Sequence, residues 1–167
     1  MQSHKNYINY NNYKKYNKNI RITKMEKEHI SAVAKLEAEV FAVPWSQQAF
    51  SDAFRMEHAF FYVAAADNDV VGYCGATVAA DEGEITNIAV APDCRRQNIA
   101  KQLLQDTMAG AYEKGARRIF LEVRSRNEPA IQLYQNAGFQ TVGIRKKYYR
   151  DPQDDALMMM YQYADII

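Results

Sequence analysis

The sequence is poor in the side chains that bind metals or build disulfide frameworks. It contains two cysteines, Cys74 and Cys94, and three histidines, His4, His29 and His58, among 167 residues. Neither residue type occurs at the spacing of a zinc site or of an HExxH helix, and the cysteines match no CxxC pair. We therefore expect reduced thiols, no bound metal and no cysteine–histidine nucleophile.

Long apolar runs are also lacking. The sequence has no stretch of 18 or more apolar residues, and it does not start with the apolar central run of a secretory signal. The formal net charge is +1, which gives no indication of a nucleic-acid partner. These absences predict a cytoplasmic protein that acts on neither a membrane nor a nucleic acid.

The start of the chain differs from the rest in composition. Residues 1–19 hold four of the 21 Lys and Arg and none of the 20 Asp and Glu, and they consist mainly of Asn, Tyr and Lys. Because these side chains cannot build a core, we predict a disordered tail over 1–19 and a single domain over 20–167. The alternative is a weak helical or RNA-contacting face, since tyrosines recur every three residues at Tyr7, Tyr10, Tyr13 and Tyr16.

Hydrophobic periodicity predicts a series of strands and helices after this tail. Alternation of apolar residues predicts strands, and spacings of three and four predict helices. The expected elements are strand 20–25, helices 26–43 and 44–54, strands 60–66, 70–80 and 83–91, helix 99–114, strand 117–123, helix 128–137, and strands 139–149 and 156–163. A strand, a helix and a strand in succession imply a parallel crossover. We therefore predict an α/β (α+β) fold in β-α-α-β-β-β-α-β-α-β-β order, with a mixed sheet of about seven strands and flanking helices.

The stretch IAVAPDCRRQNIAKQLL, residues 88–104, joins an expected strand to a helix and carries Arg95, Arg96 and Lys101. The first N–H groups of a helix lack internal partners and add about half a unit of positive charge. The turn therefore favours an anion, and its strand–turn–helix geometry suits a phosphate or a pyrophosphate. A solvated basic turn is the alternative.

Two side chains further along can supply acid–base chemistry. In RIFLEVR, Glu122 shares a face with Phe120 and Arg124 and is the lone acid of the run. A carboxyl group partly withdrawn from water is a better general base, whereas an ion pair with Arg124 would make it a solvated surface group. Tyr134 either packs in the core or presents its hydroxyl, and Asn127 is placed to cap the helix that carries Tyr134.

These stretches together resemble a known family. The order NIAVAPDCRRQNIAKQLL, LEVRSRNEPAIQLYQNAGF, RKKYY and DDALMM resembles the GNAT acyltransferase superfamily, and within it the RimI-type protein N-terminal acetyltransferases, over roughly residues 20–162. The resemblance implies acetyl-CoA as cosubstrate and a protein N-terminus as acceptor, from a ribosomal protein of the small-subunit protein eighteen type. It also implies Glu122 as general base and Tyr134 as proton donor to the departing thiolate.

The resemblance assigns the acetyl-CoA contacts to three places in the chain: a strand that pairs with pantetheine, a loop that cradles the pyrophosphate, and one asparagine. The implied residues are Ile88, Ala89, Val90, Arg95, Arg96, Gln97, Asn98, Ile99, Ala100, Lys101 and Asn127. The family's loop pattern is Q/R-x-x-G-x-G/A. This chain departs from it, because Asn98 stands where the pattern has its first glycine. Asparagine is the next most tolerant residue of positive φ, so we expect the turn to form, with weaker cofactor binding as the risk.

The acceptor must be a neutral amine, because an ammonium has no lone pair. An α-amino group has a pKa of about 7.7–8.0 and a lysine about 10.4, so deprotonating lysine at neutral pH costs roughly 3.5 kcal/mol more. An unassisted carboxylate such as Glu122 therefore suits an N-terminus better than a lysine. Glu84, on the preceding strand, is a rival base.

Two further segments resemble the parts that flank the acceptor in RimI-type enzymes, VPWS at 43–46 and RKKYY at 145–149. The alternatives are a turn between two helices and a solvated strand end. Two other functions stay open. One is a lysine or small-amine acetyltransferase on the same fold, because a fold does not determine its acceptor. The other is a non-catalytic acetyl-CoA-binding module, which the substitution at Asn98 keeps open.

Overall fold

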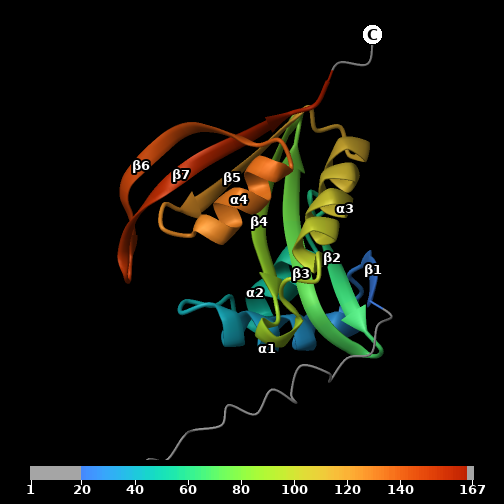
Figure 1. Ribbon diagram of the computed structural model, residues 1–167. Coiled ribbons are helices and arrows are strands. Elements are labelled where there is room, and N and C mark those ends of the chain that lie inside the picture. Colours follow the sequence, from blue (N-terminus) through green and yellow to red (C-terminus); the bar gives the residue numbers. More distant parts are fainter. Residues whose placement is uncertain (1–19, 165–167) are drawn as a thin grey trace, which may run out of the picture.

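The computed structural model describes residues 20–164, which form a mixed sheet with helices on both faces (Figure 1). The two expectations for residues 1–19 lie outside the described residues. The elements are β1 (Ile20–Lys24), the short 3-10 helix η2 (Lys27–His29), α1 (Ile30–Val40), α2 (Gln47–Phe54), β2 (Ala59–Ala66), β3 (Asp69–Ala79), β4 (Glu82–Val90), the 3-10 helix η3 (Pro92–Cys94), α3 (Ile99–Glu113), β5 (Arg118–Arg124), α4 (Glu128–Asn136), β6 (Gln140–Arg150) and β7 (Gln153–Gln162). The predicted order of strands and helices is confirmed.

The sheet has seven strands in the order β1-β2-β3-β4-β5-β7-β6. Strands β4 and β5 pair in parallel, and the other neighbours pair antiparallel. The parallel pair is connected through α3, which is the crossover that the sequence predicted.

Strands β4 and β5 separate soon after they begin. Their paired residues are Glu82–Glu84 with Arg118–Phe120. Beyond this point β4 continues beside β3 up to Val90, and β5 continues beside β7 up to Arg124. Figure 1 shows the two ribbons diverging, with the β6–β7 hairpin curving away on the side of β5. The second half of β4 therefore has one edge that no neighbouring strand of the described sheet occupies.

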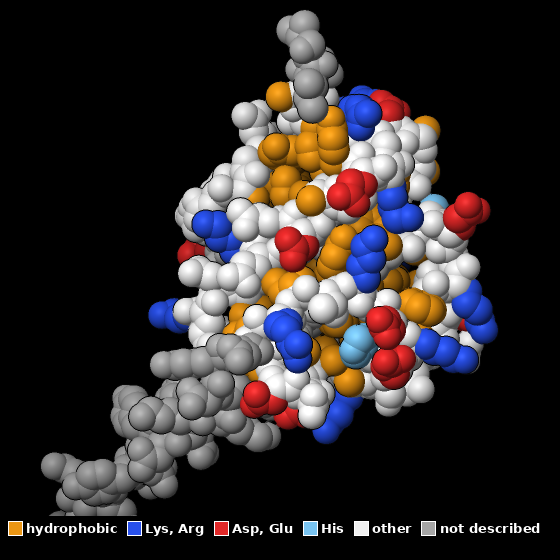
Figure 2. All heavy atoms as spheres, turned by 90° about the vertical axis from the view of Figure 1, so that its right-hand side faces the viewer, with side chains coloured by type: hydrophobic (Ala, Val, Ile, Leu, Met, Phe, Trp, Pro, Cys, Tyr) orange, Lys and Arg blue, Asp and Glu red, His pale blue; other side chains and the backbone are white. Residues whose placement is uncertain are grey.

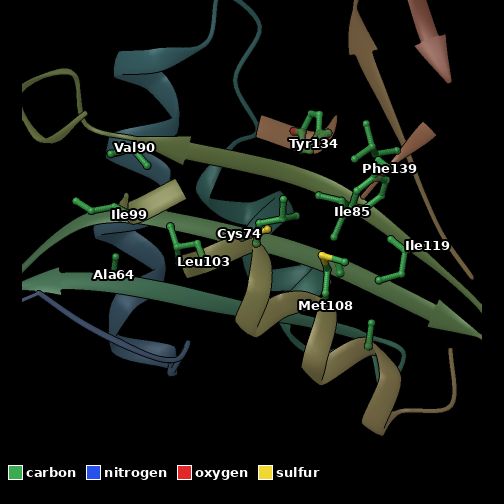
Figure 3. Packing of buried hydrophobic residues seen from close by; sticks show 14 of the residues in the cluster. Ala64, Cys74, Ile85, Val90, Ile99, Leu103, Met108, Ile119, Tyr134 and Phe139 are labelled. Atoms are coloured by element: carbon green, nitrogen blue, oxygen red, sulfur yellow. The ribbon is translucent and has the colours of Figure 1, made fainter. Parts of the chain in front are cut away.

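Each face of the sheet has its own core. On the face covered by α3 and α4, the α3 stripe Ile99, Leu103, Leu104 and Met108 is buried, as its helical spacing predicted. The same cluster contains alternate β5 residues, Ile119, Leu121 and Val123 (Figure 3). On the face covered by α1 and α2, a second cluster is built on Phe50, Phe61 and Tyr73. Phe120, Glu122 and Arg124, at the alternate positions of β5, therefore face the α1–α2 side.

A bulge in β4 changes which residues face which side. Gly75 of β3 is opposite Asn87, and Ala76 is opposite Ile85, so that Thr86 is the extra residue. Thr86 lines a pocket on the α2 side, and Asn87 donates a hydrogen bond to a residue of α1, so both side chains face the α1–α2 layer. The bulge thus places two consecutive polar side chains on one face at the point where β4 leaves β5.

The last strand begins earlier than the sequence pattern indicated. RDPQDD was expected to be a polar connection, with a strand from residue 156, but β7 starts at Gln153. Tyr149 pairs with Asp154 and Arg150 with Gln153, which extends the ladder into the acidic segment. The carboxylates of Asp154 and Asp155 accept hydrogen bonds from neighbouring elements, so their low strand propensity is overridden by tertiary contacts.

The surface over β1, β2 and α3 carries acidic and basic side chains interspersed among apolar ones (Figure 2). Among the residues that the structure describes, no helix is both long enough and apolar enough to cross a membrane.

Candidate active site

The basic turn between β4 and α3 contains two left-handed residues. Arg96 has a φ of 59°, and Asn98 has a φ of 61° and a ψ of 10°. The expectation that Asn98 takes the positive φ of the family's glycine is therefore confirmed. The left-handed conformation of Arg96 was not indicated by the sequence. Left-handed residues in such turns aim successive N–H groups at one point, which creates an anion-binding concavity.

The backbone N–H groups at the start of α3 have no capping side chain, which leaves them free to bind an anion. Asn98 is the N-cap residue, but its side chain makes no capping hydrogen bond to the helix. The first N–H groups of α3 are therefore available to a ligand. Ile99 contributes only its backbone here, because its side chain is buried in the core.

The side chains of the turn divide into two groups. Arg95 turns back along the chain, and its Nε donates a hydrogen bond to the carbonyl of Val90 at 3.2 Å. That contact closes the turn onto the end of β4. Exposed polar side chains surround the helix start: Arg96, Gln97, Asn98 and Lys101. Ala100 is the last residue of the predicted loop and the second residue of α3. It is half-buried, and its side chain is only a methyl group.

The strand segment predicted to pair with pantetheine lies at the opening of the sheet. Ile88, Ala89 and Val90 are held on one side by Cys74, Tyr73 and Gly72 of β3. On the other side they lie beyond the last residue of β4 that pairs with β5, which is Glu84. Their contact with acetyl-CoA stays a prediction, and the unpaired strand edge is what such a contact needs.

Glu122 is held by an arginine other than the one expected. The hypothesis of an ion pair with Arg124 is wrong, because Arg145 of β6 places its Nε 3.0 Å from Glu122 Oε1. Arg124 instead donates hydrogen bonds to the backbone carbonyls of Pro152 and Asp151, and its guanidinium lies 4.1 Å from the ring centre of Tyr149. The antiparallel register of β5, β7 and β6 brings Arg145 to this position, which sequence spacing alone does not show.

The Glu122 side chain is 23% exposed. A hydrogen bond to Glu122 raises the pKa of the Tyr148 hydroxyl, and the charge of Glu84 adds a smaller effect in the same direction. Both candidate bases therefore lie within electrostatic range of the same tyrosine. The effect of Glu122 on this hydroxyl is the larger of the two, and the choice between Glu122 and Glu84 as base stays a prediction.

Tyr134 occupies the opposite face. It is 5% exposed and packs against Phe139, with ring centres 5.8 Å apart. Figure 3 shows it together with Phe139 and Ile85 in the layer that contains α3 and α4. Burial raises the pKa of its hydroxyl well above the ordinary value, with Cys74 and Tyr149 adding to the shift. The hydroxyl is therefore protonated at neutral pH and can donate a hydrogen bond.

Asn127 has the structural role expected from its position. Its Oδ1 accepts a hydrogen bond from the backbone N–H of Ala130 at 3.3 Å, and it is the N-cap of α4. Its contact with the cofactor stays a prediction. The cap fixes the first turn of α4, the helix that carries Tyr134.

One residue that the sequence analysis missed lies at the centre of the α1–α2 side. Glu37 of α1 is 1% exposed, and its carboxylate accepts hydrogen bonds from β3, from β4 and from the loop between α1 and α2. The donors are the Tyr73 hydroxyl, the backbone N–H of Trp45 at 3.2 Å and Asn87 Nδ2 at 3.3 Å. The sequence did carry a signal, because Glu37 lies four residues after Val33 on the apolar stripe of the helix.

A pocket of about 360 Å³ opens beside this cluster. Trp45 and Phe61 line it together with small residues of β3, and Thr86 of the β4 bulge lies at one end. One residue of the expected acceptor segment 43–46, Trp45, therefore lines a pocket on the same face of the sheet as Glu122. The residues lining it are Trp45, Ala49, Asp52, Ala53, Met56, Ala59, Phe61, Ala76, Thr77 and Thr86.

Comparison with known proteins decides the family. The model of the acetyltransferase (GNAT) family matches residues 30–139, which include β4, the basic turn, β5 and α4. The chain belongs to the GNAT acetyltransferase family. Among the described residues, no group of three or more His, Cys, Asp or Glu could hold a metal ion.

Several GNAT relatives match the chain over most of its length. It is 39% identical over 139 residues to a Bacillus subtilis protein provisionally named a ribosomal protein bS18-alanine N-acetyltransferase, covering 83% of this chain and 92% of that protein. It is 31% identical over 140 residues to the Escherichia coli ribosomal protein bS18-alanine N-acetyltransferase, covering 83% and 94%. The crystal structure of the E. coli ribosomal-protein-S18-alanine N-acetyltransferase superposes with a TM-score of 0.80 at 28% identity, covering 89% of this chain and 98% of that one.

Proposed function

We propose that this chain transfers the acetyl group of acetyl-CoA to the N-terminal α-amine of a protein, and that the acceptor is ribosomal protein bS18. The arrangement that supports this most directly is that Glu122 and Tyr134 lie on opposite faces of the sheet, with Glu122 on the part of β5 that borders the opening between β4 and β5. A thioester placed in that opening would meet a carboxylate on one side and a hydroxyl on the other. The choice of bS18 as acceptor rests on the names of the relatives given above.

In this proposal acetyl-CoA is held at three places. The pyrophosphate lies at the N–H groups that open α3, beside Arg96 and Lys101. The pantetheine arm lies along the free edge of Ile88–Val90, and Asn127 contacts the cofactor from the start of α4. These places fit the ligand because the turn is electropositive and the strand edge is unpaired.

Glu122 is the general base. Its carboxylate takes a proton from the acceptor ammonium, directly or through a water, and the amine lone pair then attacks the thioester carbonyl. Arg145 engages Oε1 and orients the carboxylate. An α-amine needs roughly 3.5 kcal/mol less help than a lysine at neutral pH, which is why one carboxylate suffices for an N-terminus.

Tyr134 assists the leaving group. When the C–S bond breaks, the sulfur of coenzyme A becomes a thiolate, which the Tyr134 hydroxyl stabilises by donating a hydrogen bond. Burial raises the pKa of this hydroxyl further above that of a thiol, so full proton transfer from it is uphill. The proton that completes the thiol therefore comes from the amine nitrogen of the tetrahedral intermediate.

The first residues of the acceptor lie in the pocket beside Trp45. That pocket is on the Glu122 side of the sheet and is lined mainly by apolar side chains. Glu84 and Glu122 lie on the same face of the sheet as the pocket, and their negative charge would attract a cationic N-terminus. The segment 145–149 forms the other flank, because Arg145 and Tyr148 both contact Glu122.

The test is incubation of the protein with acetyl-CoA and three acceptors: a peptide with a free N-terminal alanine and one internal lysine, the same peptide with a blocked N-terminus, and a small amine. Mass spectrometry then locates the acetyl group. We expect it on the α-amine of the unblocked peptide. Acetylation of the lysine, or no acetylation while coenzyme A binds, would replace this function by the lysine or non-catalytic alternative.

Variants test the two catalytic assignments. We expect Glu122→Gln to lower kcat by about 10²-fold or more, the usual contribution of a general base. The matched control is Glu84→Gln on the same face of the sheet, which should change kcat by less than about threefold, as for a surface charge. Tyr134→Phe should lower kcat much more than it raises the KM for acetyl-CoA. A larger loss in Glu84→Gln than in Glu122→Gln would exchange the two roles.

A further inference from the structure

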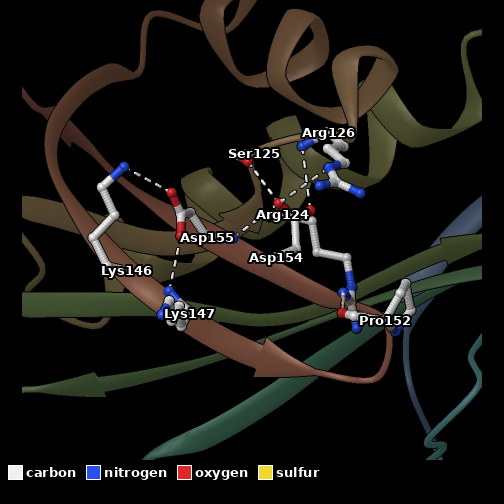
Figure 4. Close-up of polar contacts among 8 residues, drawn as sticks. All are labelled: Arg124, Ser125, Arg126, Lys146, Lys147, Pro152, Asp154 and Asp155. Atoms are coloured by element: carbon white, nitrogen blue, oxygen red, sulfur yellow. Dashed lines mark hydrogen bonds and ion pairs between the residues drawn. The ribbon is translucent and has the colours of Figure 1, made fainter.

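Two adjacent carboxylates at the start of β7 contact two segments that border this site, the turn between β5 and α4 and the irregular part of β6. Asp154 is 7% exposed, and Asp155 follows it in the strand. Successive side chains of a strand point to opposite faces, so neighbouring residues can serve different partners. Figure 4 shows that they do: Asp154 contacts the turn after β5, and Asp155 contacts two lysines of β6.

Asp154 fastens the turn that leads into α4. Its Oδ1 accepts a hydrogen bond from Ser125 Oγ at 2.6 Å, and its Oδ2 accepts one from the backbone N–H of Arg126 at 3.3 Å. The backbone N–H of Ser125 also donates to the Asp155 carbonyl at 2.9 Å. The next residue is Asn127, the N-cap of the helix that carries Tyr134. Asp154 therefore holds in place the two residues that precede Asn127.

Asp155 fastens an irregular part of β6. It accepts hydrogen bonds from the backbone N–H of Lys147 and from Lys146 Nζ, both at 2.8 Å. Lys147 has a φ of 52°, and the pairing of β6 with β7 shifts between Arg145 and Tyr149. A left-handed lysine is strained, so a carboxylate that bonds its N–H stabilises the bulge.

That bulge sets the acceptor side. Arg145 precedes it and forms the ion pair with Glu122, and Tyr148 lies within it and bonds Glu122. In this irregularity three residues of β6, 146–148, lie opposite the single residue Asp155. In a regular ladder, strict alternation would place Tyr148 on the face opposite Arg145, away from Glu122. The geometry around the proposed base therefore depends on the contact between Asp155 and Lys147.

We propose that Asp154 and Asp155 are positioning residues with separate tasks. Asp154 holds the β5–α4 turn, and with it Asn127 and Tyr134, for acetyl-CoA. Asp155 holds the β6 bulge, and with it Arg145 and Tyr148, for the acceptor. This proposal rests on the function given above. The hydrogen bonds to both carboxylates lower their pKa values, in agreement with donors aimed at the charged form.

The test is a comparison of Asp154→Asn with Asp155→Asn in the full chain. We expect Asp155→Asn to raise the KM for the acceptor peptide by about tenfold, the loss of one charge-assisted hydrogen bond, with the KM for acetyl-CoA changed less than about twofold. Asp154→Asn should instead lower kcat and weaken coenzyme A binding by about tenfold, with the acceptor KM nearly unchanged. Equal changes of the same parameters in both variants would overturn the proposal, because a merely structural role would not separate them.

Three controls sharpen the comparison. Lys146→Met removes the exposed ion pair but keeps the Lys147 N–H bond, so the acceptor KM should change less than about twofold. Ser125→Ala removes the Asp154 contact from the other side and should reproduce the weaker coenzyme A binding. Asp69→Asn, in the distant β2–β3 hairpin, should change neither parameter. An acceptor KM shift in Lys146→Met as large as that of Asp155→Asn would assign the effect to surface charge and overturn the role of the bulge.

The outcome is separable from that of the proposed function. Coenzyme A affinity is measured by calorimetry without an acceptor, so the Asp154 result is obtained whichever amine the enzyme uses. Weaker binding in Asp154→Asn but not in Asp155→Asn supports the separate tasks even if the unmodified protein acetylates lysine. Failure of the unmodified protein to acetylate any α-amine would overturn the function alone.

Discussion

The buried carboxylate of Glu37 is expected to be one of the strongest single contributors to stability on the α1–α2 face. It receives hydrogen bonds from the Tyr73 hydroxyl, the Trp45 backbone and Asn87 Nδ2. A buried charge is costly unless it is well bonded, and a bond to a charged group contributes about 1.5–3 kcal/mol. Burial, followed by the bond to Glu37, raises the pKa of Tyr73, so this hydroxyl stays protonated and donates.

The perturbation is Glu37→Gln, which keeps the shape but removes the charge. The amide oxygen can keep the two bonds made to Oε1, but the NH2 that replaces Oε2 leaves the Tyr73 O–H without its acceptor, and every remaining bond loses the assistance of the charge. We expect a loss of about 2–4 kcal/mol in the free energy of unfolding. That is a large part of the 5–15 kcal/mol, roughly, that holds a domain of this size together.

Urea unfolding monitored by the fluorescence of Trp45, the single tryptophan, measures this loss. The matched control is Glu39→Gln on the exposed side of the same helix, which should stay within about 0.5 kcal/mol of the unmodified protein. A double-mutant cycle with Tyr73→Phe should give a coupling of about 1.5–3 kcal/mol. Additivity of the two substitutions, or an unchanged midpoint in Glu37→Gln, would refute the reasoning.

Three other predictions follow from backbone geometry and charge. Asn98→Ala should lower the free energy of unfolding, followed by thermal denaturation, by about 1 kcal/mol, because alanine resists the left-handed region. Asn98→Gly should be neutral or stabilising. The reverse order would show that the side chain matters more than φ. Gly75→Ala should cost about 1–3 kcal/mol in urea unfolding, because its Cβ would lie 2.5 Å from Phe61, and an unchanged midpoint would mean that the ring moves freely. Asp154 and Asp155 have lowered pKa values in the folded state, so their stabilisation is complete above the unfolded value near 3.8 and is lost as the pH falls through the folded values. Acid titration should therefore destabilise the unmodified protein more than Asp154→Asn, and equal losses would contradict this.

The order of elements could be predicted because it depends on local pattern. The α3 stripe, the alternation in β5 and the cap at Asn127 are each contained within a few residues, and all are present in the structure. The left-handed conformation of Asn98 was also predictable, since a family pattern marked that position as one that needs positive φ. Local chemistry and local geometry agree at these places.

Long-range pairing was not predictable in the same way. The partner of Glu122 is Arg145, and the distance of 23 positions between them is bridged only by the register of three antiparallel strands. Within one strand, Arg124 was the nearest cation, and a rule based on spacing selects it. The early start of β7 was missed for a related reason, because the donors that accommodate Asp154 and Asp155 come from other elements.

The bulge at Thr86 shows why these missed features bear on function. Without it, strict alternation would place Thr86 and Asn87 on opposite faces, and Asn87 could not bond Glu37. With it, β4 supplies the α1–α2 side with two polar residues where the strand leaves β5, while Ile85 still packs toward Tyr134. In the proposed function the acceptor lies on the α1–α2 side and Tyr134 on the other, so this extra residue would give each face its own polar groups. Deleting Thr86 should therefore leave acetyl-CoA within reach of Tyr134 but remove a side chain that lines the pocket beside Trp45, so that kinetics would show a loss confined to the acceptor.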